Sequence, residues 1–229
     1  MLAISVIIPT WRDTEALQSL LPSLAAMQPP ALEIIVVDGA ADAEVVALCD
    51  ANKVIYITAA AGRGTQLNCG ARRAQGAVLW FVHADAAPDS ASLAAIEAAV
   101  QRGARAGYFR FRFAGERSLT RSLLERCIGW RCRFGTVYGD QALFITRQAW
   151  QGTEALFEEV PLFEEVALVK RLKCAGAFTA LDTAVGVSPR RWQRDGWWRR
   201  TLMNRLLALG YILGVPPAQL ARWYTQQKS

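Results

Sequence analysis

The chain has 229 residues, enough for one full-sized domain that buries its own core without disulfides or structural metal. Hydrophobic residues make up 52% and charged residues 20% of the sequence, which excludes a disordered, collagen-like or low-complexity chain. The net charge of +6 is unevenly placed: residues 1–100 hold five Lys and Arg against ten Asp and Glu, and residues 101–229 hold twenty-one against ten. The second part therefore has a net charge of +11, which favours an anionic ligand, a nucleic acid or an acidic membrane surface as its partner.

Apolar runs alternate with helical patterns over the first hundred residues. Four runs that end in turn or polar residues predict buried parallel strands at Leu2–Ile8, Ile34–Val37, Val54–Ile57 and Ala77–Val82. Helical spacing of apolar residues predicts helices after these strands, at Thr14–Met27, Asp42–Ala51, Thr65–Gln75 and Pro88–Arg102. This alternation implies right-handed crossovers and a ligand crevice at the carboxyl ends of the strands.

The pattern changes after Gly103. We expect strands at Tyr108–Phe113, Ala142–Ile145 and Ala184–Val187, and helices at Ser118–Phe134, Phe163–Cys174, Trp197–Gly214 and from Pro216 to about Tyr224. The alternation of Tyr108, Arg110 and Arg112 is typical of a solvated edge strand. Because the sequence contains no internal repeat and no flexible linker, it predicts one continuous α/β domain with a basic helical extension at its C-terminus.

Several features favour the cytoplasm. The five cysteines are odd in number and scattered, as expected of free thiols in a reducing compartment. The N-terminus begins directly with an apolar strand pattern and lacks the basic and cleavage regions of a secretory signal. The longest apolar stretch, Leu206–Pro217, is shorter than the roughly 18–20 residues that span a bilayer.

Polar residues follow the predicted strands where a crevice should lie. Asp38 ends the second strand, Gly62-Arg63-Gly64 follows the third, and His83-Ala84-Asp85 follows the fourth. A carboxylate at such a position can accept hydrogen bonds from a ribose or hold a divalent cation that bridges phosphates. Taken alone, Asp38 is more often a turn residue and the single histidine, His83, more often structural.

Seven blocks follow one another along the chain: Ser5-Val6-Ile7-Ile8-Pro9-Thr10, Glu33–Gly39, Gly62-Arg63-Gly64 with Gln66–Ala71, Leu79–Asp85, Gly139-Asp140-Gln141-Ala142, Phe163-Glu164-Glu165-Val166 and Arg190-Arg191-Trp192. In this order they resemble glycosyltransferase family 2, and within it a small soluble bacterial subgroup. The resemblance covers nearly the whole chain. It implies a GT-A fold, which is a Rossmann-like, three-layer α/β fold with a mostly parallel central sheet. It also divides the domain, 1–229, into a nucleotide-binding half (1–100), an acceptor-side half (101–189) and basic aromatic C-terminal helices (190–229).

The resemblance implies a nucleotide-diphosphate sugar as donor. Pro9, Thr10 and Asp38 would line the nucleoside pocket, with Arg63 and Asn68 beside the base or phosphates and Arg191 on the diphosphate. Asp85, the last position of the family's D-x-D motif, would hold Mg²⁺ or Mn²⁺. The leaving diphosphate gains charge in the transition state, and a divalent cation with arginine neutralises it. His83 stands where the family has the first Asp of this motif.

The acidic pair Glu164-Glu165 matches the family's catalytic acids at the start of a helix. The resemblance assigns Glu165 as the general base of an inverting transfer, because such a transfer needs one carboxylate to accept the proton of the acceptor hydroxyl. The other interpretation is that the pair only favours the helix dipole. Asp140 would lie near the sugar and acceptor, with a plain turn residue as the alternative.

The segment Arg190–Arg222 mixes tryptophan with arginine. In the resemblance Trp192 would pack at the acceptor mouth, although Ser188 replaces the glutamine that precedes this block in processive relatives. Aromatic residues beside arginines fit peripheral contact with the inner face of the cell membrane and a lipid-linked hydroxyl acceptor. Against this, the stripe Leu202, Leu206, Leu209 and Leu213 is more typical of a core or homodimer interface.

Two other functions compete with glycosyl transfer. Gly62–Leu67 resembles the glycine loop of sugar-phosphate nucleotidyltransferases, although in those enzymes the loop follows the first strand. A non-catalytic basic module that binds anionic membrane is the second. Nucleic acid is the least favoured partner, because the sequence has no helix-turn-helix, zinc-finger or RNP-like pattern.

Overall fold

The computed structural model of the protein describes residues 1–150, 156–176 and 178–226. One eight-stranded sheet runs through it, in the order β3-β2-β1-β4-β7-β6-β8-β5. The strands are β1 Ile4–Thr10, β2 Glu33–Asp38, β3 Ile55–Thr58, β4 Val78–Phe81, β5 Ala86–Pro88, β6 Ala106–Phe113, β7 Phe144–Thr146 and β8 Phe178–Val187. The helices are α1 Thr14–Ala25, α2 Ala43–Asn52, α3 Arg63–Arg73, α4 Ser92–Gln101, α5 Leu119–Phe134, α6 Arg147–Trp150, α7 Val166–Cys174, α8 Arg190–Asp195, α9 Trp197–Ile212 and α10 Pro217–Gln226.

The sheet has a parallel half and a mixed half. Strands β3, β2, β1 and β4 run parallel, as the alternation of strands and helices predicts. Strand β7 runs antiparallel to both β4 and β6, and β6 and β8 are parallel to each other. The α/β fold class and the mostly parallel first half are therefore confirmed. The antiparallel strands are β5, at one edge of the sheet, and β7, near its centre.

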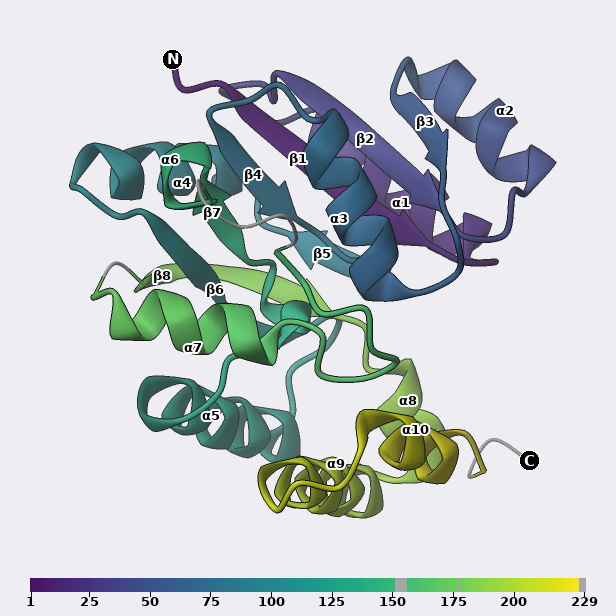
Figure 1. Ribbon diagram of the computed structural model, residues 1–229, viewed down its shortest axis with the longest axis vertical. Helices are drawn as coiled ribbons and strands as arrows, with labels where there is room; N and C mark the ends of the chain where they lie inside the picture. Colours follow the sequence, from purple (N-terminus) through teal and green to yellow (C-terminus); the bar gives the residue numbers. More distant parts are fainter. Residues whose placement is uncertain (151–155, 177, 227–229) are drawn as a thin grey trace.

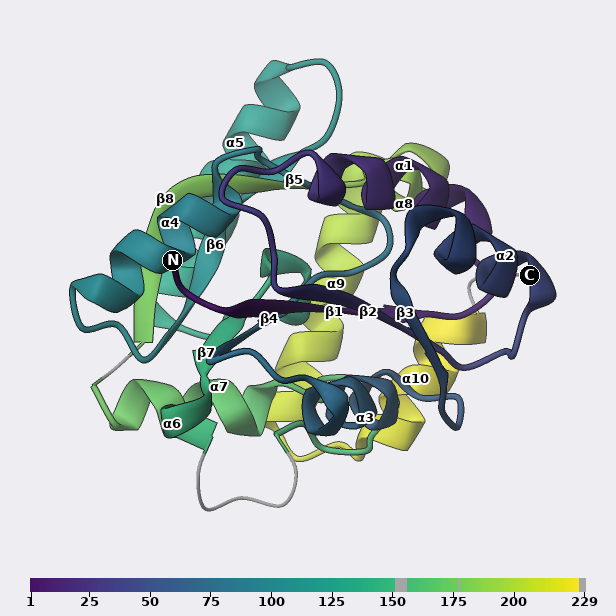
Figure 2. The ribbon, with the colours of Figure 1, turned by 90° about the horizontal axis from the view of Figure 1, so that it is seen from above.

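Helices cover both faces of the sheet, so the molecule has three layers (Figures 1 and 2). One core packs α1, α2 and α4 against the sheet, with Trp80 and Phe109 at its centre. The other core packs α3 and α7 against the opposite face. Gly70 lets α3 approach β1 closely, because a Cβ there would lie 2.4 Å from Cγ2 of Ile7.

A second group of helices lies beyond the sheet, at the lower end of the molecule in Figure 1, where α5, α8, α9 and α10 gather. They pack partly through a small cluster of Phe111, Phe113, Leu124, Val187 and Trp192. Within the described ranges, no helix combines the length and apolarity needed to cross a bilayer.

Several local predictions need correction. The helix expected from Phe163 begins at Val166, because Phe163 has a left-handed backbone with φ of 67° that cannot enter a helix. Strand β8 is longer than the predicted Ala184–Val187. The prediction is too short because apolar and polar residues alternate in the first part of the strand, which therefore contains no continuous apolar run. Arg110 and Arg112 of β6 are exposed as expected, but Tyr108 is buried and stacks on Phe178, so the strand is not a simple solvated edge.

Candidate active site

A cavity of about 620 Å³ opens at the carboxyl ends of β1 and β4. All three expected segments of the chain contribute to it. The predicted site residues that line it are Pro9, Thr10, Arg63, Asp85, Asp140, Glu164, Glu165, Arg191 and Trp192. His83 lines it as well. Ligand crevices of doubly wound sheets lie at this edge, so the fold brings nine of the eleven predicted residues to one place.

The acidic pair forms one wall of this cavity. Glu164 is buried and its carboxylate accepts a hydrogen bond from Arg63 Nη1 at 2.9 Å. Glu165 is also buried, and it stands at the N-cap position of α7. Burial, reinforced by the negative charge of Glu164, raises the pKa of Glu165 to about 8, although Arg63 and the backbone N–H of Gly139 act in the opposite direction. The two neighbouring carboxyls therefore differ in environment: Glu164 is ion-paired with Arg63, and Glu165 is not.

His83 lies against the same acidic wall. A Cβ on Gly139 would lie 3.1 Å from Nε2 of His83 and 3.9 Å from Cδ of Glu165, so these three residues share one corner of the cavity. Burial, together with the positive charges of Arg63 and Arg191, holds the pKa of His83 well below its usual value. The imidazole is therefore neutral at physiological pH and supplies no charge where the family has an aspartate.

Asp140 and Asp85 face the cavity from two different segments. Asp140 lies in the short 3₁₀ turn Gly139–Gln141, and its Oδ1 is buried without a hydrogen-bond partner among the described residues. Burial raises the pKa of Asp140, against the positive charges of Arg131 and Arg63, and the nearby charge of Asp85 adds to the rise. A buried carboxylate oxygen with no partner is costly unless a ligand or cation meets it.

These carboxylates fit a divalent cation that the substrate helps to hold. The described part of the chain has no group of three or more His, Cys, Asp and Glu that could hold a metal by itself. Mg²⁺ in phosphate-handling enzymes commonly takes only one or two protein carboxylates and completes its shell with phosphate oxygens and water. Asp85 and the orphan oxygen of Asp140 supply that number.

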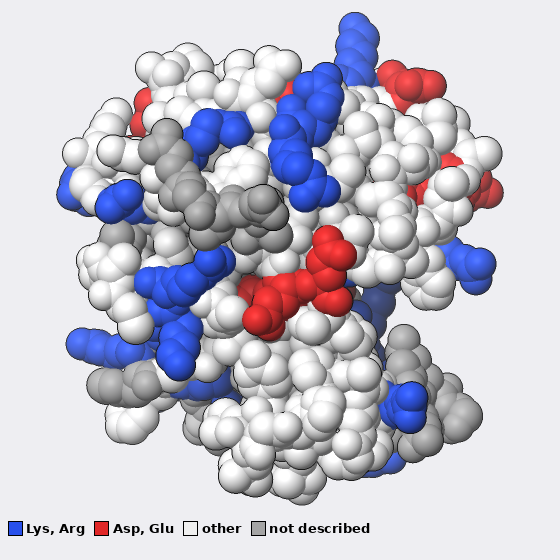
Figure 3. Space-filling view, viewed as in Figure 1, with Lys and Arg blue, Asp and Glu red and all other residues white. Residues whose placement is uncertain are grey.

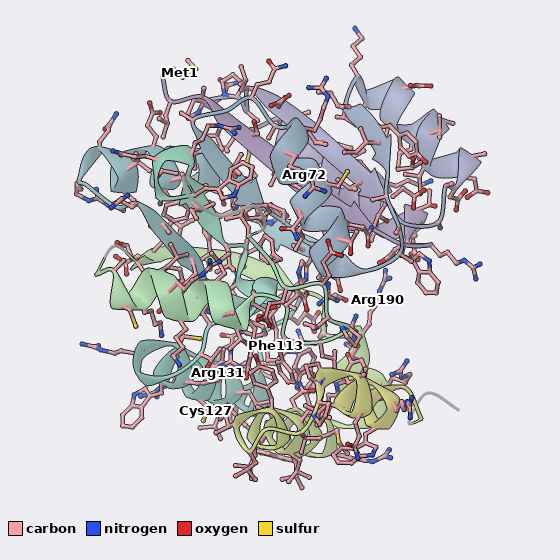
Figure 4. All side chains as sticks on the ribbon, viewed as in Figure 1. Met1, Arg72, Phe113, Cys127, Arg131 and Arg190 are labelled. Carbon is pink, nitrogen blue, oxygen red and sulfur yellow. The ribbon has the colours of Figure 1, made fainter. Side chains whose placement is uncertain are left out.

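The positive charges of the cavity come from three elements. Arg63 begins α3, whose N-terminus also presents Gly62 to the cavity. Arg191 is on α8 and donates a hydrogen bond from Nη1 to the hydroxyl of Tyr224 at 2.8 Å. Arg131 reaches the cavity from α5, and its guanidinium lies 4.4 Å from the ring centroid of Tyr138 (Figure 4). A helix N-terminus beside three arginines forms a strong anion-binding environment.

Two predicted residues do not line the cavity. Asp38 is fully buried, and its carboxylate accepts hydrogen bonds from the backbone N–H groups of Ala40 and Asp42 and from the hydroxyl of Tyr56. This is the turn role that its residue type favours. Asn68 is buried as well. It contacts the segment that begins at Leu156 and is not among the cavity-lining residues, where a position beside the base or phosphates was expected. Its amide donates to the carbonyl of Phe157 and accepts from the N–H groups of Leu156 and Phe157.

Trp192 forms part of an apolar wall of the cavity. Its ring is buried, lies 5.0 Å from that of Phe113, and donates its Nε1–H to the Thr201 hydroxyl at 3.3 Å. The same wall includes apolar side chains from α5 and α9, namely Leu124, Ile128 and Leu207. The helices beyond the sheet therefore contribute an apolar patch to the cavity as well as its arginines.

Arg131, Arg205 and Tyr224 also line the cavity, although the sequence motifs do not predict them as site residues. Arg131 follows Leu124 and Ile128 at helical spacing, and this spacing is a sequence signal for an inward face of α5. Arg205 lies on the polar side of the leucine stripe, which was a similar signal. Tyr224 carried none, because only the packing of α10 brings it to Arg191 and Arg200.

Known structures share this architecture. TarS 1–349 of S. aureus in complex with UDP-GlcNAc is 19% identical with a TM-score of 0.64, and the match covers 81% of this chain and 58% of that chain. Glucosyl-3-phosphoglycerate synthase from Mycobacterium tuberculosis in complex with phosphoglyceric acid is 16% identical with a TM-score of 0.65, and the match covers 94% of this chain and 81% of the synthase. This chain thus spans little more than half of the TarS 1–349 chain, and 37% of the longer TarS chain. Among curated proteins, no sequence matches.

The sheet order, the crevice at its carboxyl edge and these structural matches define the GT-A class of fold. The family model described as "Glycosyl transferase family 2" matches residues 5–161, more than half of the chain. The chain belongs to that family. The matched range includes Asp85 and Asp140 and ends shortly before Glu164.

Proposed function

We propose that the protein is an inverting glycosyltransferase that moves a sugar from a nucleotide-diphosphate sugar to a hydroxyl acceptor. The observation that carries this proposal is the buried Glu165 in a cavity that also holds Asp85, Asp140 and three arginines. Family membership supports the reaction class. Solved relatives support the donor class, because TarS was crystallised with UDP-GlcNAc and the mycobacterial synthase with UDP and Mn²⁺.

On the donor side, Pro9 and Thr10 at the end of β1 line the nucleoside pocket. Arg63 and Arg191 face the diphosphate. A divalent Mg²⁺ or Mn²⁺, held by Asp85 with Asp140, would neutralise the charge that develops on the leaving diphosphate. Arg63 is ion-paired with Glu164 and Arg191 is hydrogen-bonded to Tyr224, so both guanidinium groups are already oriented before the donor arrives.

On the acceptor side, Glu165 accepts the proton of the attacking hydroxyl. A carboxyl whose pKa lies near 8 holds its proton more strongly than an ordinary glutamate, which strengthens it as a base once it is ionised. The hydroxyl oxygen forms its bond to the anomeric carbon on the face opposite the diphosphate while the bond from that carbon to the diphosphate oxygen breaks. The nucleoside diphosphate leaves with the electron pair, and the configuration inverts. The apolar wall of Leu124, Ile128 and Trp192 supports an acceptor with an apolar part, such as a lipid-linked hydroxyl.

A reducing cytoplasm is the compartment that we propose. All five cysteines are free, and Cys127 is exposed, as thiols in a reducing environment can be.

A donor panel tests this function. The protein is incubated with UDP-, GDP- and TDP-sugars in the presence of Mn²⁺ or Mg²⁺, and binding and release of the nucleoside diphosphate are measured. We expect one donor to bind and to release its nucleoside diphosphate, with the transferred sugar inverted at its anomeric carbon by NMR. Failure of all donors to bind would overturn the proposal. Release of pyrophosphate from a nucleoside triphosphate would instead support the nucleotidyltransferase, which the position of Gly62 after β3 already disfavours.

A further inference from the structure

Helix α9 is amphipathic, but its polar side faces the protein and its apolar side faces solvent. Its side chains Thr201, Asn204 and Arg205 face the cavity. Most of its large apolar side chains face solvent, with Leu202 61% exposed, whereas Leu207 is buried at the cavity. The exposed stripe consists of Trp198, Leu202, Leu206, Leu209 and Leu213, which recur at helical spacing. Because soluble helices place such a stripe against the core, this one is built for contact with something outside the described chain.

Helix α5 continues the same apolar surface. Leu119 is 92% exposed and Trp130 75% exposed, and Leu123 lies between them at helical spacing. The two helices meet where the guanidinium of Arg121 lies 5.2 Å from the ring centroid of Trp197. Both helices lie at the lower end of the molecule in Figure 1, and Figure 3 shows that end as a largely uncharged surface bordered by basic side chains. We call the exposed apolar side chains of these two helices the α5–α9 face.

The charges around the α5–α9 face indicate which kind of partner it contacts. Residues 196–229 contain no Asp or Glu. Exposed arginines flank the apolar stripe, at Arg126 on α5 and Arg199 on α9. A symmetric homodimer through this face would set each cationic surface against its own copy, which like-charge repulsion opposes. An anionic bilayer satisfies both features, since leucine and tryptophan enter the interface and arginine meets the lipid phosphates.

We propose that the α5–α9 face docks the protein on an anionic lipid bilayer. The inner sides of the same two helices form the apolar wall of the cavity, so docking places the acceptor end of the cavity at the membrane surface. The inner side of α9 also carries the polar Thr201, Asn204 and Arg205 into the cavity, beside Leu207. That an acceptor reaches the cavity from the bilayer rests on the proposed function; the docking itself does not.

Vesicle co-sedimentation tests the docking. The full chain is mixed with phosphatidylcholine vesicles, or with vesicles that also contain phosphatidylglycerol, at low and at high salt. A triple variant, Leu202→Gln with Leu206→Gln and Leu209→Gln, removes the apolar stripe without touching the core. Leu32→Gln in the loop before β2 is the matched control for Leu206→Gln, because Leu32 is 53% and Leu206 51% exposed.

We expect the wild type and Leu32→Gln to bind phosphatidylglycerol vesicles in a salt-sensitive way, and the triple variant to bind at least about tenfold more weakly. The proposal is overturned if the wild type does not bind these vesicles or if the triple variant binds equally well. It is also overturned if sedimentation velocity shows a wild-type dimer that the triple variant converts to monomer, because a second copy then covers the face. Nucleotide-sugar binding, measured on the same preparations, reports on the proposed function separately.

Discussion

Arg63 donates a hydrogen bond of 2.9 Å to the carboxylate of Glu164, and this contact separates the roles of two adjacent acids. Glu164 has a cationic partner in the buried wall of the cavity, whereas Glu165 has no ion pair of its own among the described residues. Because burial and the charge of Glu164 both raise its pKa, Glu165 is the carboxyl suited to exchange a proton during a reaction.

The pH dependence of transfer follows from this environment. Glu165 must be ionised to accept a proton, and its pKa lies at about 8. We therefore expect kcat/KM to rise as the pH increases and to level off above about 8. Initial rates across this range with the best donor give the profile. A profile that is flat through pH 8, or that falls there, would contradict the role of Glu165.

The contribution of Glu165 to folding stability should fall as the pH rises, whereas its contribution to the transfer rate should increase. The folded protein holds the proton of Glu165 up to about pH 8, while an unfolded chain releases it near the ordinary value of 4.5. The stabilisation is therefore complete below pH 4.5 and is lost as the pH rises through about 8. In thermal melts, Glu165→Gln should gain stability relative to the wild type as the pH rises, whereas the exposed Glu159→Gln should not. A difference in Tm that does not change with pH would refute this.

The fold was largely predictable because its first half is built from buried apolar strands. Such runs as Ile4–Thr10 and Glu33–Asp38 are apolar along most of their length and end in polar residues, so their boundaries show in the sequence. Strand β5, Ala86–Pro88, has only three residues and depends on antiparallel pairing with β8. No local sequence pattern predicts pairing between segments that lie so far apart in the sequence.

The site was predictable to the extent that its residues follow strands. Asp85 and Thr10 reach the cavity because β4 and β1 end there. Asp38 ends a strand in the same way, but its carboxylate is taken up by the N–H groups of the next turn. Spacing cannot distinguish these two outcomes, since both place an aspartate after a strand.

Asn68 offers a test of such a buried role. Its amide makes three hydrogen bonds to the backbone of Leu156 and Phe157. Asn68→Ala leaves these groups unpaired, so we expect the free energy of unfolding to fall by about 2–4 kcal/mol. Arg72→Ala, on the exposed side of the same helix (Figure 4), should change it by less than about 0.5 kcal/mol. Loss of donor affinity with unchanged stability would instead place Asn68 at the ligand.

Metal removal tests the proposal that Asp85 and Asp140 hold a divalent cation. We expect a chelator to abolish transfer and added Mn²⁺ or Mg²⁺ to restore it. Asp85→Asn removes a charged ligand and should raise the Mn²⁺ concentration for half-maximal rate at least about tenfold. Asp182→Asn, at an exposed position of β8, is the control and should leave this concentration unchanged. Full activity of the wild type in the chelator would contradict a metal-dependent mechanism.

The most direct measurement compares the transfer rates of Glu165→Gln and Glu159→Gln with that of the wild type, at saturating donor and acceptor. Glu159 is an exposed acid nearby in the sequence, so its variant controls for the loss of a negative charge. If Glu165 accepts the proton of the acceptor hydroxyl, Glu165→Gln lowers kcat by at least about 10²-fold while the donor still binds, and Glu159→Gln retains the wild-type rate. A Glu165→Gln enzyme that transfers sugar at the wild-type rate would contradict the account.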